Sequence, residues 1–171
     1  MGAAPAPAGI VIPGVILRFL DRASIGYAAT RDPGLAPSLH WVCGWSLEPD
    51  PEALAFLVSE PFTASLLRNL AGCPRVALTV EHIGPHETYQ FKGDFDGSRA
   101  PGPRERRAFE ACRERFVRDV QQADARHGFA RELLERYAGL PALAVRLRVR
   151  EIFLQTPGPG AGRRLVPPEA A

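Results

Sequence analysis

The sequence predicts a mainly β protein with added helices, in the α+β class, whose strands form an antiparallel barrel or sandwich. Three observations support this fold class. Short segments of alternating apolar and polar residues are separated by turn-forming residues, one helical pattern interrupts them, and a longer helical pattern precedes the last alternating segment. Short strands joined by tight turns are typical of antiparallel hairpins.

The first expected elements are a short helix and a pair of strands. Pro13 suits the first position of a helix that runs to Asp21, because its missing N–H would have no partner there. Residues 23–31 and 35–46 are strand-like. The Asp-Pro-Gly sequence between them predicts a turn, since proline presets φ and glycine accepts a positive φ.

A second helix and two more strands follow. We expect a strand over 53–58 and then a helix that ends at Gly72, a residue type favoured just past helix ends. Strands over 75–81 and 86–96 are joined by a Gly-Pro turn, and apolar residues alternate with other residues in the first of them.

A helical insert of residues 104–139 precedes the last strand. Apolar residues recur at helical spacing in two runs, which His127-Gly128 separates. In the last strand, valine and leucine alternate with arginine as far as Glu151, and residues 152–154 are all apolar. This break predicts a bulge, or passage of the strand under a partner.

Length and composition predict a single domain with a sizeable core, since the chain has 171 residues and a mass of 18.6 kDa. We expect a disordered tail over 1–9, the domain over 10–155 and a Pro/Gly-rich tail over 156–171.

A net charge of +2 gives no strong attraction to nucleic acid or to an anionic membrane. Three cysteines without a C-x-x-C pair, and no membrane-spanning or signal segment, predict a cytoplasmic protein.

The chain contains one lysine, Lys92, among 21 lysine and arginine residues. In the strand Tyr89-Gln90-Phe91-Lys92-Gly93, Gln90 and Lys92 point to one face, and Tyr89 and Phe91 point to the other. Two polar groups on one strand face suit an acidic or hydrogen-bonding ligand. The alternative is an outward face in water, where lysine is common.

Three other segments could carry chemistry. Thr63, Ser65 and Arg68 lie in the first turns of the second helix, where free N–H groups and the helix dipole favour an anion. Simple capping of the helix is the alternative.

In residues 38–45, odd-numbered Trp41, Cys43 and Trp45 are expected on one side of a strand, where they would form either a surface for a planar cofactor or ordinary barrel packing. Two histidines and two glutamates flank the turn at 81–87, and spacing this loose favours coincidence over a metal site.

Taken in order, these segments resemble the FMN-binding split-barrel family, the pyridoxamine 5′-phosphate oxidase-like proteins. The resemblance covers about residues 13–163 and is carried by the order of the segments rather than by one specific motif. After a short first helix, the matching parts are the opening strand 25–30, the turn into 36–38, the phosphate-side helix and "NPRVAL"-type strand 62–78, the "QxKG"-type strand 89–93, and the end 155–160.

The resemblance implies an antiparallel Greek-key split barrel that forms a homodimer, with one FMN in each of two grooves at the subunit interface. It places the phosphate near the second helix, with other cofactor contacts on the strand of Lys92 and on residues 38–41. The implied cofactor-binding residues are Ser38, His40, Trp41, Thr63, Ser65, Arg68, Gln90 and Lys92. The flavin would supply the redox chemistry, and the protein would supply binding, orientation and electrostatics.

The expected function is therefore an FMN-dependent oxidoreductase for a small molecule, with a deazaflavin as a variant cofactor. The strict pyridoxamine 5′-phosphate oxidases have a C-terminal segment with substrate-binding arginine and histidine, whereas this chain has a Pro/Gly tail with Arg163 and Arg164 after Leu154. This difference and Glu60 at the phosphate side argue against pyridoxamine 5′-phosphate as the substrate. A non-catalytic flavin carrier or sensor is one alternative. The other is a haem-binding or haem-handling barrel, whose candidate axial ligands are His40, His82, His86 and His127.

Overall fold

The computed structural model describes residues 9–123, 132 and 139–166. Seven strands form one antiparallel sheet in the order β3-β2-β1-β4-β5-β6-β7, and a further pairing of β3 with β6 closes six of them into a barrel. The strands are β1 (Ile25–Arg31), β2 (Pro37–Leu47), β3 (Ala53–Ser59), β4 (Arg75–His82), β5 (Glu87–Arg99), β6 (Pro141–Leu154) and β7 (Arg164–Val166). This confirms the predicted α+β fold with an antiparallel split barrel.

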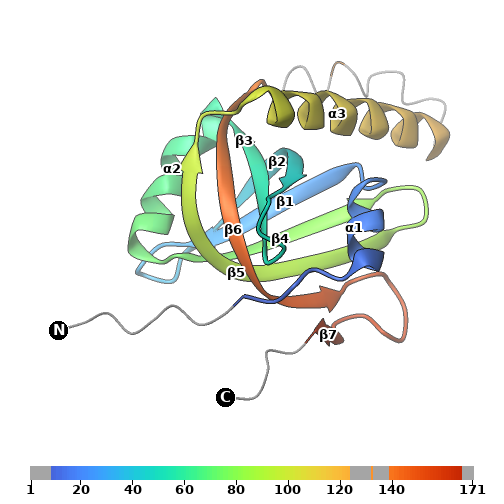
Figure 1. The fold of residues 1–171 in the computed structure, drawn as a ribbon, viewed down its shortest axis with the longest axis horizontal. Coiled ribbons are helices and arrows are strands. Elements are labelled where there is room, and N and C mark those ends of the chain that lie inside the picture. Colours follow the sequence, from blue (N-terminus) through green and yellow to red (C-terminus); the bar gives the residue numbers. More distant parts are fainter. Residues whose placement is uncertain (1–8, 124–131, 133–138, 167–171) are drawn as a thin grey trace.

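The three described helices flank the barrel (Figure 1). Helix α1 (Gly14–Leu20) and helix α2 (Glu60–Gly72) lie at opposite sides of it, and α3 (Pro103–Ala123) lies across one end. Helix α1 places Ile16, Phe19 and Leu20 in the main core. The predicted bounds of α1 and the predicted end of α2 agree with the structure to within one or two residues, which is the usual disagreement at helix ends.

The main core fills the barrel with inward-facing side chains of β1 to β6. Its largest fully buried members from the strands include Phe56, Leu78, Phe91 and Leu147. A second cluster lies outside the barrel wall, where Cys43 and Leu57 meet Phe109 and Phe116 of α3. Among the residues with described structure, no helix has the length and apolar character needed to span a membrane.

A bulge in β2 corrects one sequence expectation. Val42 pairs with Val58 and Trp45 pairs with Phe56, so β2 has one more residue than β3 between these pairs. The extra residue reverses the alternation, and Trp45 points into the main core, where its indole N–H donates to the carbonyl of Leu20 at 3.0 Å. Trp41 stays on the outside, so the expectation that both indoles share one side was wrong.

A second bulge lies where β6 passes β5, as the broken alternation predicted. Lys92 pairs with Glu151 and Gly93 pairs with Val149, which leaves Arg150 as the extra residue. Gly93 is required here, because a Cβ on it would lie 2.0 Å from the backbone oxygen of Arg148. The "QxKG"-type motif therefore has a packing role at its glycine, beside any role of its lysine.

The ends of the chain differ from the expected tails where they are described. Residues 164–166 pair with β6, and the backbone N–H of Leu154 donates to the carbonyl of Arg163 at 2.9 Å. The N–H of Ile10 likewise donates to Val149 at 2.9 Å. The segment around His127 lies outside the described residues, as does most of the second half of the predicted insert.

Candidate functional site

A groove of about 360 Å³ crosses the outer face of β1, β4, β5 and β6. We call it the Lys92 groove, because Lys92 lies in its lining together with Thr30, Arg75, Arg150 and Glu151. Lys92 pairs across the sheet with Ala77 on one side and with Glu151 on the other. Small residues of β1 and β4 leave space above this part of the sheet.

The ammonium group of Lys92 has an aromatic partner and no carboxylate partner in the described part of the chain. Its Nζ lies 4.4 Å from the centre of the Phe153 ring, a distance at which a cation is attracted to the face of the ring. Glu151, which pairs with Lys92 across the strands, instead accepts from Arg164 at 2.7 Å. The positive charge of Lys92 is therefore available to a ligand.

Arg75 and Arg150 add charge to one side of the groove. Both bind Asp94, with nitrogen to oxygen distances of 3.3 Å for Arg75 and 2.8 Å for Arg150. Arg150 is 8% exposed, and its Nη1 is buried without a hydrogen-bond partner among the described residues. A buried donor that lacks a partner costs free energy, so this guanidinium is suited to bind a further acceptor.

The sheet beside the groove presents an aromatic outer face. Trp41, Tyr27, Thr79 and Gln90 follow one another across β2, β1, β4 and β5. The rings of Tyr27 and Trp41 lie 5.8 Å apart, and the amide of Gln90 donates to the hydroxyl of Thr79 at 3.1 Å. The predicted orientation of Gln90 and Lys92, with Phe91 buried on the opposite face, is confirmed.

Helix α2 holds the residues that the resemblance assigns to a phosphate. Thr63 and Ser65 donate their hydroxyl hydrogens to the carbonyls of Glu60 and Phe62, at 2.8 and 3.1 Å. These are bonds within the first turns of the helix, so the two hydroxyls act locally in this structure. Arg68 is exposed on the same helix, and none of the three lines the Lys92 groove.

His40 lies inside the barrel rather than on its outer face. It is 2% exposed, its Nε2 lies 3.1 Å from the Thr30 hydroxyl, and Asn69 donates to the same hydroxyl at 3.0 Å. Burial lowers the pKa of His40 below its ordinary value, so the ring is neutral at pH 7. Ser38 pairs with Thr30 and is half-buried, and neither Ser38 nor His40 lines the groove.

The other described histidines lie at the β4–β5 turn. His86 is exposed and contacts Glu81 at 3.0 Å, whereas His82 lies 3.6 Å from the buried carboxylate of Asp119 on α3. No three metal-ligating side chains gather into one group in the described ranges. Of the eight predicted cofactor residues, the structure places Lys92 in the groove and puts Gln90 and Trp41 on the adjoining sheet face.

Sequence reasoning did not identify Arg75 and Arg150 as groove residues, or Phe153 as the aromatic partner of Lys92. A signal for Arg150 was present, because the break in alternation at Glu151 marks the bulge that this arginine occupies. The role of Phe153 depends on its position across the sheet, which periodicity alone does not reveal.

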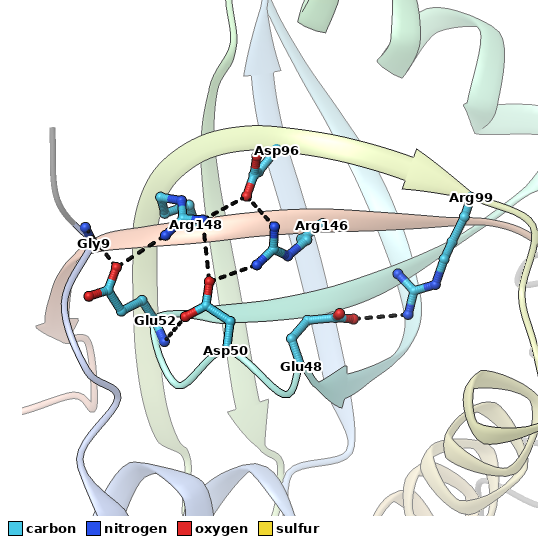
Figure 2. A network of polar contacts seen from close by, with 8 residues as sticks. All are labelled: Gly9, Glu48, Asp50, Glu52, Asp96, Arg99, Arg146 and Arg148. Carbon is cyan, nitrogen blue, oxygen red and sulfur yellow. Dashed lines mark hydrogen bonds and ion pairs between the residues drawn. The ribbon is translucent and has the colours of Figure 1, made fainter. Parts of the chain in front are cut away.

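A contrasting group of arginines lies on the outer face of β6 away from the groove (Figure 2). Arg146 binds Asp50 and Asp96, and Arg148 binds Asp50, Glu52 and Asp96. Glu52 also accepts the backbone N–H of Gly9 at 3.0 Å. These arginines connect the β2–β3 turn, β5, β6 and the N-terminal segment, and their charge is neutralised within the fold.

Comparison with known proteins supports the fold. No model of a known protein family matches the sequence, and no curated protein is similar to it by sequence. Among solved structures, HupZ of Group A Streptococcus is similar, with a TM-score of 0.52 and 14% identity over 88% of this chain and 100% of that one. So is a pyridoxamine 5′-phosphate oxidase-related, FMN-binding protein of Nostoc punctiforme, with a TM-score of 0.50 and 14% identity over 94% and 89%.

Identities this low establish the arrangement of the chain and leave its chemistry to be argued from its own residues. Both similarities extend over most of each chain, and they concern a chain whose strands close into an antiparallel barrel. The chain therefore has the split-barrel fold of the pyridoxamine 5′-phosphate oxidase-related proteins, which confirms for the fold the resemblance seen in the sequence.

Proposed function

We propose that this protein is a flavoprotein that binds FMN in the Lys92 groove and acts as an oxidoreductase on a small molecule. One observation carries the proposal: the single lysine of the chain lies in a groove with no carboxylate partner in the described structure, beside an aromatic sheet face. A planar anionic cofactor needs both an apolar surface and a nearby cation. The fold that this chain shares with an FMN-binding protein adds support.

The described residues include candidates to bind both the ring system and the phosphate of FMN. Lys92 and Gln90 would face the flavin ring system, where the ammonium would stabilise negative charge and the amide would form hydrogen bonds. An arginine would bind the phosphate, because a guanidinium matches its geometry. Arg68 on α2 is the candidate that the resemblance implies, and the unpartnered Nη1 of Arg150 is the candidate that the groove offers.

The protein is also proposed to be a homodimer with the cofactor at the subunit interface. The outer face beside the groove is unusual for a surface in water, since Leu39 is 65% exposed there and Tyr27 and Trp41 lie next to it. A second copy that covered this face would bury apolar area, which favours association. The cofactor would then be enclosed between two sheets, and the location proposed for the dimer is the cytoplasm.

When bound, FMN would supply the electron transfer. The chain's own contribution would be to bind the ring, exclude water from one of its faces and hold the Lys92 charge near it. Among the described histidines none lines the groove, so an axial haem ligand there has no candidate in that part of the chain. This observation favours a flavin over haem.

The first test is the visible absorption spectrum of the purified protein, followed by heat release and identification of any chromophore. We expect bands near those of free flavin and release of FMN, with one FMN per chain after reconstitution. Light scattering of the same sample should give twice the mass of the chain. A Soret band would show that the protein binds haem and not FMN. Failure to take up FMN, haem or a deazaflavin would contradict the cofactor proposal altogether.

A turnover assay distinguishes an FMN-dependent enzyme from a non-catalytic flavin carrier or sensor. With FMN bound, anaerobic mixing with a nicotinamide donor should bleach the flavin, and oxygen or a second acceptor should restore it. Binding of FMN without any reduction by nicotinamide or other donors would support the carrier instead.

A further inference from the structure

A second cavity, distinct from the Lys92 groove, lies between β2 and α3. It has a volume of about 160 Å³, and we call it the α3 cavity. Its described lining is mainly aromatic and thiol-bearing, and it includes Trp41, Cys43, Phe109, Cys112 and Phe116. It has no lining residue in common with the Lys92 groove.

The path of α3 creates this cavity. The helix packs Phe109 and Phe116 onto Cys43 and Leu57 outside the barrel wall. Gly44 permits this close approach, because a Cβ there would lie 3.2 Å from the Cα of Phe109. The helix is therefore held close to β2 at Gly44, and the ring of Trp41 on the same strand lines the α3 cavity.

The cavity lining is apolar in character, although it contains two cysteines. Burial raises the pKa of both the Cys43 and the Cys112 thiols to about 12, so both stay neutral at physiological pH. Their hydrogens are directed to backbone carbonyls, at 3.3 Å for Cys43 to Leu57 and 3.5 Å for Cys112 to Ser24. Arg113 adds a positive charge, and its Nη1 lies 4.0 Å from Glu110.

The volume sets the size of an occupant. An engineered apolar cavity of about 150 Å³ stays dry and binds benzene, and the α3 cavity has a similar volume with a largely apolar lining that also contains Ser24 and Arg113. We propose that the α3 cavity binds a small uncharged molecule with a single six-membered aromatic ring, against Trp41, Phe109 and Phe116. An apolar lining disfavours a charged molecule, which would lose its hydration there, and the volume excludes a fused three-ring system.

Trp41 connects this site to the outer sheet face. Its ring centre lies 5.9 Å from that of Phe116 on the cavity side and 5.8 Å from that of Tyr27 on the sheet side. An occupant of the cavity would therefore change the surroundings of Trp41. The proposal does not depend on FMN, since none of the described residues that line the cavity belongs to the groove.

The two tryptophans give the test an internal control. The full-length protein, carrying whatever chromophore it has when purified, is labelled with ¹⁵N and titrated with phenol while the two indole N–H signals are observed. A Trp41→Phe variant assigns the signals. We expect the Trp41 signal to shift saturably and the Trp45 signal to stay in place, because the Trp45 indole points into the main core. No shift, or equal shifts of both signals, would overturn the proposal.

A matched pair of cysteine variants tests the location. Cys112→Met extends a longer side chain into the cavity and should weaken phenol binding at least tenfold. Cys73→Met makes the same change at a buried cysteine that does not line the cavity, and should leave binding unchanged. Equal effects of the two variants would contradict the assigned site.

The ligand class is tested on the unaltered protein, so it does not depend on whether the variants fold. Benzylamine, a cation, and acridine, a fused three-ring compound, should each bind at least tenfold more weakly than phenol. If either bound as tightly as phenol, the assigned charge or size would be wrong. FMN binding in the groove is measured in a separate experiment. If the protein did not bind FMN, the phenol titrations would still test the α3 cavity.

Discussion

The two cationic regions on β5 and β6 differ in how their charge is used. On one side of the bulge, Arg146 and Arg148 are bound to carboxylates of the β2–β3 turn and of β5 (Figure 2). On the other side, the ammonium group of Lys92 lies over the ring of Phe153 and forms no ion pair with the described residues. The arginines hold elements of the fold together, whereas the lysine contributes no ion pair within the described residues.

This difference separates structural charge from functional charge. A cation that the fold has neutralised has little charge left for a ligand, whereas an unpaired one in a groove can bind an anion. Composition does not distinguish them, because 20 of the 21 cationic side chains are arginine and most of those are surface residues. The partners in the structure make the distinction, and variants in each region test it.

The largest effect is expected at Gly93, where the two regions meet. In Gly93→Ala the added Cβ would collide with the backbone oxygen of Arg148, and backbone on both strands would have to move. We expect a loss of about 3 kcal/mol or more in the free energy of unfolding, measured by urea denaturation. Both the groove and the arginine network should be disturbed together.

The control for that variant is Gly84→Ala, in the β4–β5 turn. No heavy atom lies within 4 Å of a Cβ built there, so we expect a change within about 0.5 kcal/mol. A similar loss in both variants would show that alanine is tolerated poorly at glycines in general and that the contact with Arg148 is not the cause.

The next effect concerns binding. Lys92→Met keeps an apolar stem over Phe153 and removes the charge, so FMN affinity should fall about tenfold, which corresponds to about 1.4 kcal/mol. The free energy of unfolding should change by less than about 0.5 kcal/mol, because no ion pair in the described structure is lost. Titration of the flavin-free protein with FMN, followed by flavin fluorescence, measures the affinity.

Two further variants sharpen the Lys92 prediction. Lys92→Arg retains a cation and should recover part of the affinity. Arg22→Met removes an exposed cation paired with Glu87, away from the groove, and should leave FMN affinity unchanged. If Arg22→Met weakened FMN as much as Lys92→Met, the effect would reflect net charge and not the groove.

The reverse pattern is expected for the arginine network. Arg148→Met removes ion pairs with Asp50, Glu52 and Asp96 and should lower the free energy of unfolding by about 1 kcal/mol, since partly exposed pairs are individually weak. FMN affinity should stay the same. Arg18→Met, at an exposed arginine with no ion pair in the described part of the chain, serves as the control and should have no measurable effect.

Much of the fold could be predicted because local patterns determine it. The alternation in residues 75–81, the Asp-Pro-Gly turn and the proline and glycine that bound the two short helices each carry their own signal. The bulge at Arg150 was also predictable, because an extra residue shifts the alternation along the rest of the strand. The orientation of Gln90 and Lys92 follows from the same two-residue period.

Features that depend on distant contacts could not be predicted in this way. The bulge at Cys43 and Gly44 reverses Trp45 without a break in an already apolar sequence, so the pattern 41–45 gave no warning. The contact of Lys92 with Phe153 and the cavity under α3 arise from elements far apart in the chain. In the sequence, the hydroxyls of Thr63 and Ser65 were candidates to bind an anion. The structure shows that they donate to carbonyls of their own helix.

The smallest effect is expected on acidification, and it distinguishes the network from other sources of stability. The backbone N–H of Glu52 and the guanidinium groups of Arg148 and Arg146 lower the pKa of Asp50 below its ordinary value of about 3.9. A depressed folded-state pKa stabilises the fold above the unfolded-state value, and this contribution is lost as the pH falls through the folded-state value.

Asp50→Asn tests this contribution because it keeps the oxygen that accepts from Glu52 and removes the charge that the arginines bind. The wild-type protein should be more stable than the variant at pH 6, and the difference should shrink toward zero near pH 2, as measured by urea denaturation across this range. A difference that persists at pH 2 would mean that Asp50 acts through shape rather than charge. In that case Asp96 and Glu52 alone would neutralise Arg146 and Arg148, and the contrast with Lys92 would rest on those two carboxylates.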